Sequence, residues 1–428
     1  MLLGCSDGPT VVVVGGGPAG LAAALEAARG GAEVTLLEGE PEVGGAARWA
    51  AGITWVPTAA EATAWDSAAG APSVSRDRYI ARVRPDVVEG LGVAFQAVPD
   101  PSGEGATLLA PVGGGRGIIR ALSSEAEAEG VRVQVGCRVV ALARTAPGWT
   151  VDAGECGGHL GDRVVLATGG FMGDLDEARS RLGLGATQLL RSAPVHADGN
   201  GLALAAGAKA AVPEAQAGVV YAHAVPAPHD ASVALMVVQG GPRDSVVVDV
   251  TGARKAGLLT VRGEAGRSLL DLPGRRAWLI GTAEGLGRQS AMPLEGPAVP
   301  LRAVARVHGS EAADLPSLAQ ALGMLPGALD RHAFAPGAAP GPERPLPPRG
   351  PFIAVPLQPS PAKSLGGVAS DADGRALDPA GVPVPGLYVA GELIGFGDPY
   401  GAAPRDSTMV AGAVLTGQAA GRSAARDH

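Results

Sequence analysis

The sequence is poor in aromatic residues, which make up only 3% of its 428 residues although 46% are hydrophobic. Its core must therefore be built mostly from alanine, valine and leucine. A chain of this length exceeds what one small core accommodates, so we expect two domains.

Cysteine is scarce as well, with only Cys5, Cys137 and Cys156 in the chain. No spacing rule pairs them, so the sequence predicts neither a disulfide framework nor a zinc or iron–sulfur site. A reducing cytoplasm is the location that we expect from this pattern.

An excess of charge of one sign is also missing. The net charge is −8, with both signs mixed along the chain, which argues against nucleic acid or an anionic membrane as the main partner. The apolar stretch at 11–28 is broken by glycines. It therefore predicts a strand and a helix in place of a membrane span.

The most informative stretch is 11–38, where an apolar run leads into GGGPAG, a helical pattern and a second apolar run. Gly15, Gly17 and Gly20 fit G-x-G-x-x-G, and Glu38 follows at the spacing of a ribose-binding acid. The glycines permit a tight turn and a close approach to a pyrophosphate, and the helix N-terminus attracts its charge. The stretch therefore predicts a dinucleotide-binding unit.

Two further stretches are expected near the same ligand. The buried strand pattern at 162–166 ends in small residues, and parallel strands open their ligand crevice at this end. Ala167–Gly169 would then reach the cofactor that the first glycines hold. The loop GGAARWAAG at 44–52 is small enough for its backbone to lie against a flat ligand, although an ordinary loop stays open as an alternative.

The composition changes in the middle of the chain. We expect residues 1–211 to form the first part of the dinucleotide-binding domain and 346–428 to form its second part. Residues 212–345 are predicted to be an inserted domain that ends in a proline-rich return linker. The closing part contains a strand pattern in GLYVAGE and a long helix from about Thr408 to Ala425.

These motifs together resemble the flavoprotein family of fumarate reductases, succinate dehydrogenases and 3-ketosteroid dehydrogenases. The matching stretches are GGGPAG with Glu38, GGAARWAAG, ATGGF, DGNGLALAAGA, GGVASDADGR and GLYVAGE, in the family's order. The resemblance implies an α/β fold, with a Rossmann-like FAD-binding domain on a parallel sheet that is interrupted by an inserted α+β capping domain.

The resemblance also implies the cofactor and its ligands. FAD is expected to bind without a covalent link, because GGAARWAAG contains no histidine. The pyrophosphate, ribose, ribityl chain and flavin would contact Gly15, Gly17, Pro18, Ala19, Gly20, Glu38, Gly39, Gly44, Gly45, Ala46, Gly52, Val139, Ala167, Thr168, Gly169, Asp198, Gly391, Glu392, Ser407, Thr408 and Met409. The last three begin the closing helix, whose N-terminus would stabilise reduced flavin.

The family moves hydride between the flavin N5 and a carbon of an activated C–C bond, while a side chain handles the proton. We expect Tyr400 or Tyr221 as the proton carrier or carbonyl donor, with Arg288 as a further candidate. His223, Lys363 and Arg405 would bind the substrate. For His223 a plain core or surface role stays open, and for Arg288 a solvated one.

The catalytic half departs from the family pattern at two positions. Leu258 stands where fumarate reductases have a proton-delivering glutamate, and Lys363 replaces their second substrate histidine.

Taken with these departures, the resemblance implies an FAD-dependent dehydrogenase that desaturates a carbonyl- or carboxylate-activated C–C bond in a small secondary metabolite or cyclic ketone. An ene-reductase, a flavin oxidase or monooxygenase, and a flavin-binding protein without turnover remain alternatives.

The sequence gives less information about the electron acceptor and the oligomeric state. No second strand–glycine–helix unit for NAD(P)H is convincing, so the electron acceptor is expected to be oxygen, a quinone or a redox protein. The oligomeric state stays open.

Overall fold

The protein is described from a computed structural model of residues 1–428. It describes residues 8–68, 73–84, 92–99, 107–146, 148–214, 216–237, 245–259, 263–329, 346, 349–395 and 407–426. The chain forms two compact units. The first contains Met1–Gly183, Val195–Gly218 and Lys363–His428, and the second contains Leu184–Pro194 and Val219–Ala362.

A mostly parallel sheet is the centre of the first unit. Among the described residues its strand order is β19-β20-β10-β1-β2-β6, and only the β19–β20 pair is antiparallel. The strands are β1 (Thr10–Val14), β2 (Glu33–Leu37), β6 (Arg132–Gln134), β10 (Arg163–Leu166), β19 (Arg375–Leu377) and β20 (Pro383–Val389). Val11–Val14 are at most 3% exposed, because helices and loops cover both faces of a parallel sheet.

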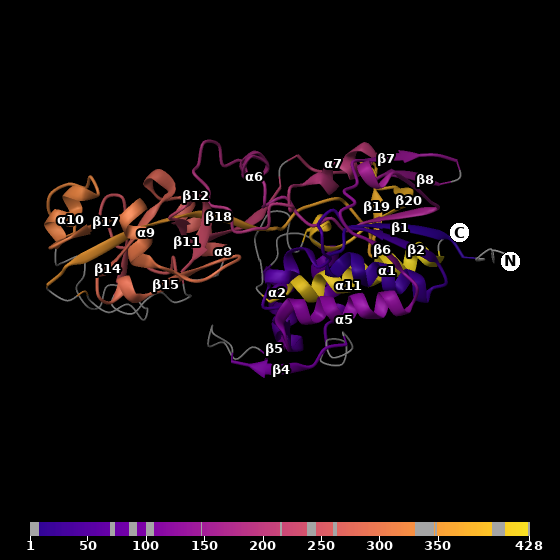
Figure 1. The fold of residues 1–428 in the computed structure, drawn as a ribbon, viewed down its shortest axis with the longest axis horizontal. Coiled ribbons are helices and arrows are strands. Elements are labelled where there is room, and N and C mark those ends of the chain that lie inside the picture. Colours follow the sequence, from indigo (N-terminus) through magenta and orange to yellow (C-terminus); the bar gives the residue numbers. More distant parts are fainter. Residues whose placement is uncertain are drawn as a thin grey trace. The chain divides into compact units, whose positions relative to one another are not determined.

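Helices from distant parts of the sequence pack beside this sheet. They are α1 (Pro18–Arg29), α5 (Gly114–Ala128) and α11 (Met409–Arg426), and Figure 1 shows the yellow α11 alongside the indigo α1. The observed bounds of the closing helix, Met409–Arg426, differ by one residue at each end from the predicted range of about Thr408 to Ala425. Its Gly417 and Gly421 face the backbone of Ala19 and Ala23 so closely that an added Cβ would lie 2.1 and 2.2 Å from their carbonyl oxygens. Small residues therefore let the two ends of the chain pack together.

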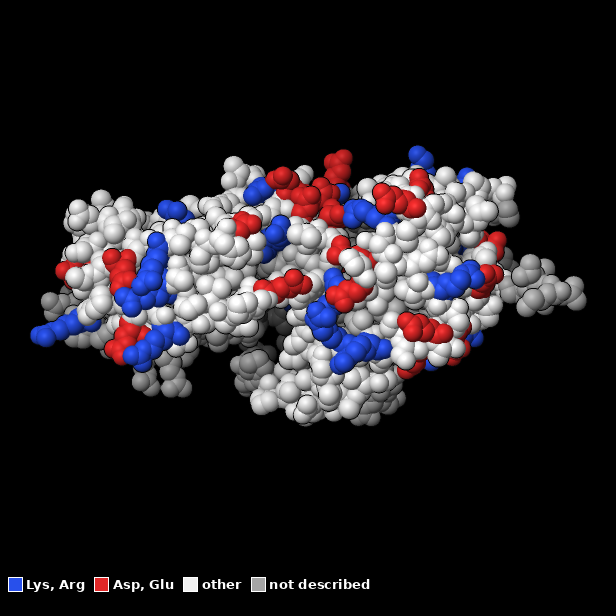
Figure 2. Space-filling model, viewed as in Figure 1, with Lys and Arg blue, Asp and Glu red and all other residues white. Residues whose placement is uncertain are grey.

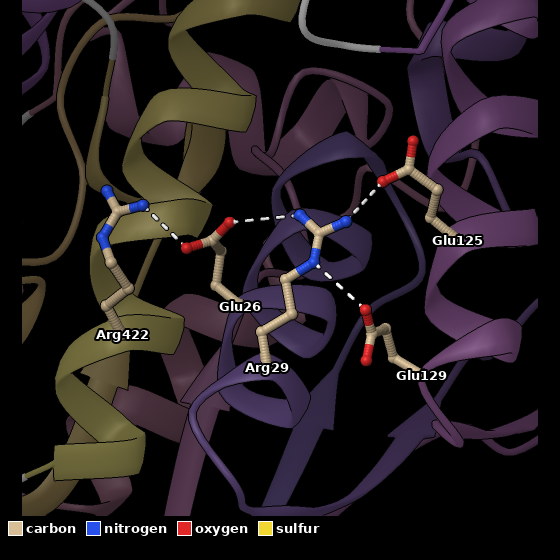
Figure 3. Close-up of polar contacts among 5 residues, drawn as sticks. All are labelled: Glu26, Arg29, Glu125, Glu129 and Arg422. Atoms are coloured by element: carbon tan, nitrogen blue, oxygen red, sulfur yellow. Dashed lines mark hydrogen bonds and ion pairs between the residues drawn. The ribbon is translucent and has the colours of Figure 1, made fainter.

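A charge network joins the same three helices at their surface. Arg29 Nη2 lies 2.7 Å from Glu125 Oε2 and its Nε lies 3.4 Å from Glu129 Oε1, while Arg422 Nη1 lies 2.8 Å from Glu26 Oε2 (Figure 3). The Arg29–Glu26 pair closes the network at 3.7 Å. Single exposed pairs contribute little, but a network of several charges can contribute more than its isolated pairs.

The remaining elements of the first unit surround this core. They are β3 (Thr54–Val56), α2 (Ala59–Ala68), α3 (Val74–Arg82), β4 (Phe95–Val98), β5 (Thr107–Pro111), β7 (Ala141–Arg144), β8 (Trp149–Asp152), β9 (Gly158–Gly161), α6 (Leu175–Arg181) and α7 (Asn200–Gly207), with short 3-10 helices η1 (Gly45–Trp49), η2 (Gly154–Cys156) and η6 (Gly391–Ile394). Three of the scarce aromatics, Trp55, Trp65 and Tyr79, pack together beside α11. Tyr79 therefore has a packing role.

The second unit is built on an antiparallel sheet with the order β13-β14-β18-β11-β12-β15-β16, and β17 also pairs with β18. Its strands are β11 (Gly218–Ala227), β12 (Asp230–Met236), β13 (Ser245–Asp249), β14 (Ala277–Thr282), β15 (Ser290–Pro293), β16 (Val299–Pro300), β17 (Ser310–Ala312) and β18 (Phe352–Ser364). Its helices are α8 (Gly263–Leu270), α9 (Leu301–His308) and α10 (Leu315–Ala321), with short 3-10 helices η3 (Pro273–Arg275) and η4 (Leu286–Arg288). The predicted α/β class with an inserted mixed domain is confirmed.

The unit boundaries differ from the predicted positions at 212 and 346. β18 belongs largely to the second sheet because it pairs with β14 along Phe352–Leu357. Leu184–Pro194 also belongs to the second unit, since Leu190 N–H donates to the Pro359 carbonyl over 2.9 Å and Arg191 pairs with Val233 of β12.

Charge is well mixed on the surface that can be seen. Figure 2 shows lysine and arginine interspersed with aspartate and glutamate on this face. No helix in the described part of the chain has the length and apolar character needed to cross a membrane.

The expectation that the cysteines stay unpaired is wrong. Cys137 and Cys156 form a disulfide with Cα atoms 5.5 Å apart, because the β7–β8–β9 sheet returns the chain beside the end of β6. Sequence spacing carries no sign of this, since 19 positions separate the two residues. The cytoplasmic location thereby loses its support from cysteine usage and stays a prediction.

Removing this disulfide is expected to destabilise the first unit. A link across 19 positions restricts the unfolded chain, and loops of this size contribute about 3 kcal/mol. Cys137→Ser/Cys156→Ser should lower the free energy of unfolding by about that amount in a urea titration, and a reductant should have the same effect on the unchanged protein only. Equal stability of both proteins in oxidising buffer would show that the link does not form.

Candidate cofactor site

The site begins at the turn between β1 and α1. Gly15 has φ +103°, and an added Cβ would lie 2.5 Å from the Ala167 carbonyl oxygen. A Cβ on Gly20 would lie 1.8 Å from the Gly15 carbonyl oxygen. Gly17, in contrast, has open space where its Cβ would be, and it precedes Pro18 at the start of the helix without any side-chain cap. The N-terminus of α1 therefore presents free backbone donors beside an open position.

Glu38 stands next to this turn at the end of β2. It is 7% exposed, and its Oε2 accepts a hydrogen bond from Gly16 N–H at 2.6 Å. Its Oε1 accepts one from Glu40 N–H at 2.8 Å. Two backbone donors hold the carboxylate in place, and its remaining lone pairs can accept from a ribose diol.

The loop after Glu38 brings a second glycine pair against the first turn. Gly44 N–H donates to the Gly16 carbonyl over 2.8 Å, and the Cβ position of Gly45 lies 3.4 Å from Gly17 Cα. Gly44 and Gly45 have φ values of +126° and +48°, so the loop needs glycine at both positions. Ala46 follows as an exposed residue. The two backbone segments therefore lie side by side at the N-terminus of α1.

The ends of β10 and β20 complete the same sheet edge. Ala167 N–H donates to the Val14 carbonyl over 2.8 Å, which places Thr168 and Gly169 directly beside the first glycine turn. The Thr168 Oγ1 is buried and has no hydrogen-bond partner among the described residues. Gly391 follows β20 with φ +75°, and a Cβ there would lie 2.7 Å from the Ala19 Cβ.

Asp198 and Val139 are joined although they are far apart in the sequence. Arg138 Nη2 donates to Asp198 Oδ2 over 2.6 Å. Asn200 donates from its side chain to the Val139 carbonyl and from its backbone to Asp198 Oδ1, both over 3.0 Å. The segment after β6 therefore lies against the turn that begins α7. Gly39 borders the same region, since its Cβ position lies 3.5 Å from the Arg138 Cβ.

Glu392 is a further carboxylate of the first unit, directly after Gly391. Its Oε1 accepts a hydrogen bond from Ser364 N–H at 2.7 Å. Burial raises the pKa of the Glu392 carboxyl above its usual value, and the hydrogen bonds from Ser364 oppose this rise only in part. Sequence reasoning missed Ser364, because no local pattern links it to a residue 28 positions away.

The start of α11 is anchored by the aromatic cluster. Trp55 N–H donates to the Ser407 carbonyl over 2.8 Å, and the Tyr79 hydroxyl, which donates to the Trp55 carbonyl over 2.5 Å, also lies 3.3 Å from the Ser407 oxygen. Ser407 has φ +62°, Thr408 is buried, and Met409 begins the helix. At the far end of the earlier loop, Gly52 has φ +71° and its Cβ position lies 2.9 Å from the Gly115 nitrogen.

The donor set of this unit fits a dinucleotide. The backbone at Gly17 and Gly45, a held carboxylate and the buried Thr168 hydroxyl, which has no partner among the described residues, gather at the carboxyl ends of parallel strands. Ligands of doubly wound sheets bind at this edge. The groups offered are those that a pyrophosphate and a ribose require.

The predicted substrate residues fall in different places. Tyr221 and His223 lie on β11 with ring centroids 5.1 Å apart, and His223 is 3% exposed. Lys363 lies near the end of β18 and is half-buried. Arg288 is exposed and its Nη2 lies 2.7 Å from Glu284 Oε1. Tyr400 and Arg405 lie outside the described residues.

Comparison with known proteins decides the family. The model described as "FAD binding domain" matches residues 10–78 and 103–404. The chain belongs to this FAD-binding family. It is an FAD-dependent oxidoreductase, as the resemblance implied.

Individual relatives agree with this assignment of the flavoprotein. A fumarate reductase (cytochrome) of Shewanella frigidimarina is 25% identical over 98% of this chain and 77% of that protein. A KsdD-like steroid dehydrogenase of Mycobacterium tuberculosis is 45% identical over 83 residues, which are 19% of this chain and 15% of that protein. A solved 3-ketosteroid delta1-dehydrogenase from Sterolibacterium denitrificans matches with a TM-score of 0.76 and 17% identity, over 98% of this chain and 100% of that chain. The last comparison establishes the fold.

The pH dependence of the flavoprotein's stability should show the effect of Glu392. Its folded-state pKa is raised, so the unfolded chain releases this proton more readily. The contribution to stability is present below the ordinary glutamate pKa and is lost as pH rises through the folded pKa. Glu392→Gln, which mimics the neutral acid, should flatten this loss in cofactor-free protein. Melting temperatures measured at acidic and alkaline pH test this, and an unchanged difference between the two would contradict it.

Proposed function

We propose that this flavoprotein dehydrogenates a C–C bond next to a carbonyl or carboxylate, in a small secondary metabolite or cyclic ketone. FAD, when bound, supplies the hydride acceptor. The proposal is supported by membership of the FAD-binding family and by the likeness to proteins named fumarate reductase and KsdD-like steroid dehydrogenase.

The observation that carries this proposal is the position of Lys363. It directly precedes Ser364, whose N–H donates to Glu392 Oε1 over 2.7 Å. Its charge also acts on Glu392 and opposes the rise in the pKa of that carboxyl. The cationic side chain of Lys363 thus lies close enough to act on Glu392, the carboxylate that we propose to contact the ribityl chain. Such an ammonium group can hold a substrate oxygen and stabilise the negative charge that develops on it.

Tyr221 and His223 are the proposed polar groups of the second unit. Both residues lie on β11, their rings are adjacent, and His223 is buried. A phenol and an imidazole on one strand can donate to a carbonyl oxygen or carry a proton. Tyr400 and Arg405 stay predictions for the same roles.

Leu258 argues against fumarate reduction. It is 2% exposed and packs in the apolar core of the second unit. A leucine cannot deliver a proton to carbon, and this is the position where the resemblance places the glutamate of fumarate reductases. The proton-delivering acid of fumarate reductases is therefore replaced at this position, and we propose the oxidative direction with an ene-reductase as the alternative.

Anaerobic reduction of the bound flavin tests the proposal. Cyclic ketones with a CH–CH unit beside the carbonyl should bleach the visible flavin absorption, and an unsaturated product should form. Lys363→Met should slow bleaching by about tenfold or more, which corresponds to one lost charged contact, while Lys363→Arg should retain part of the rate.

Other outcomes would contradict this function. Fast reoxidation of reduced flavin by an enone, without bleaching by the saturated ketone, would establish the reductase. Peroxide or oxygen insertion without a new double bond would establish an oxidase or monooxygenase. Bleaching rates that do not change in Lys363→Met would remove Lys363 from the site. The acceptor, which we propose to be oxygen, a quinone or a redox protein, follows from which of these restores the colour.

A further inference from the structure

Two segments far apart in the sequence meet beside the ribose-binding acid. Trp49, at the end of η1, has its ring centroid 5.7 Å from that of His196. The Arg48 guanidinium lies 4.5 Å from the Trp49 ring centroid. All three residues belong to the first unit. Arg48 and Trp49 lie in the 44–52 loop, but none of the three side chains is among the residues that the resemblance assigns to the cofactor.

His196 has a buried nitrogen with no protein partner. Its Nδ1 lies 3.8 Å from Glu40 Oε2, and its Nε2 is buried without a hydrogen bond to any described residue. Burial lowers the pKa of His196, and the nearby Arg48 lowers it further, while Glu40, Glu38 and Asp198 oppose both effects. A neutral imidazole has one donor and one acceptor nitrogen, so Nε2 can serve a ligand in either role.

Arg48, which also contacts Trp49, has a buried nitrogen without a protein partner as well. Its side chain is 7% exposed, and Nη1 lies 2.5 Å from Glu42 Oε1. Its Nε is buried without a hydrogen bond to any described residue. The Arg48 Cγ would lie 2.6 Å from a Cβ on Gly44, so the guanidinium branches from the loop that packs on Gly17. Buried donors without acceptors are costly unless a ligand satisfies them.

We infer that Arg48, Trp49 and His196 bind the adenosine-diphosphate part of FAD. The inference rests on the proposed placement of that part along Glu38 and Gly45. His196 lies beside Glu40, two residues from Glu38, and Arg48 lies three residues from Gly45. Both unsatisfied nitrogens therefore stand where the ribose and phosphates supply oxygen acceptors. Trp49 lies between them and fixes both side chains through ring and cation contacts.

Binding of FAD fragments to the full chain, freed of FAD, separates this role from a general one. His196→Ala should weaken FAD and ADP by the same factor, about fivefold to tenfold for one lost hydrogen bond. Riboflavin affinity should not change. Arg48→Gln should behave in the same way, with a larger factor because its donor is charged.

A matched control is available in the same unit. His159 lies on β9, which pairs with β8, and its Nε2 is also buried without a partner among the described residues, where it has no polar or ring contact with Glu38 or Trp49. His159→Ala should leave all three affinities unchanged. His196→Gln, which keeps a polar group, serves where His196→Ala does not fold.

Two results would overturn the inference. ADP affinity that does not change in His196→Ala and Arg48→Gln would exclude contact with this part of the cofactor. An equal loss for riboflavin would indicate a general structural effect. Wild-type protein that binds FAD but not ADP would contradict the placement along Glu38 itself, which is a separate failure.

Discussion

Replacing Glu38 with glutamine should yield protein that is largely colourless after purification. The carboxylate accepts two backbone hydrogen bonds, from Gly16 at 2.6 Å and from Glu40 at 2.8 Å. A glutamine has only one acceptor oxygen, so its amide would face one of these N–H donors and the glycine turn would move. Each hydrogen bond to a charged group contributes about 1.5–3 kcal/mol. Loss of one such bond and of the ribose contact should weaken FAD by about a hundredfold or more.

Glu33→Gln is the control for this change. Glu33 lies at the start of the same strand and forms an exposed pair with Arg132 at 2.7 Å. Its substitution should leave the flavin content unchanged, because exposed pairs contribute little. The measurement is the ratio of flavin to protein absorbance, followed by titration with FAD. A Glu38→Gln protein with a full complement of FAD and unchanged affinity would refute the placement of the cofactor.

The glycine turn and Glu38 could be predicted because their signals are local. Strand, turn, helix and acid follow one another within 11–38, and each has a period or residue type that the backbone requires. The same holds for the end of β20, where GLYVAGE gives a strand pattern and a glycine at positive φ. Local patterns thus carried the prediction of the cofactor unit.

The disulfide and β18 could not be predicted because they depend on distant pairing. Cys137 and Cys156 are joined by a small sheet that the spacing of the residues does not show. β18 contains prolines at 356, 359 and 361, which normally argue against a strand. It forms because it pairs with β14 along Phe352–Leu357, and beyond this stretch the Pro359 carbonyl accepts from Leu190 N–H and the Pro361 carbonyl accepts from the Ser192 hydroxyl.

The same limit explains the residues that sequence reasoning missed at the site. Ser364 and His196 gain their meaning only from Glu392 and Glu40, which lie far from them in the sequence, and Arg48 gains its meaning from the fold of the 44–52 loop, which the sequence does not show. The small number of histidines in the sequence was a signal that could have pointed to His196. Histidine occurs seven times in the chain, so each one next to a predicted cofactor loop could have been considered.

The close packing of α1 and α11 leads to the second large effect. Gly417→Ala would place a methyl group 2.1 Å from the Ala19 carbonyl oxygen and 2.8 Å from its carbon. Backbone atoms cannot turn aside as a side chain can, so the helices must separate. Overpacking usually costs about 1–3 kcal/mol, and we expect the upper end of that range or beyond it. Because Ala19 lies in the first turn of α1, the same shift should move the glycine turn and weaken FAD.

Gly207→Ala separates this steric effect from the general consequence of adding a methyl group to a helical glycine. Gly207 ends α7 and has no atom within 4 Å of its Cβ position. Its substitution should be neutral or stabilise by about 0.5–1 kcal/mol, because alanine loses less backbone entropy than glycine. The free energy of unfolding, measured by urea titration, and the flavin content should therefore both fall in Gly417→Ala. Neither should fall in Gly207→Ala. If the two variants were equally stable and equally yellow, the closing helix would not pack on α1 through this glycine, and the join between the two ends of the chain would need another explanation.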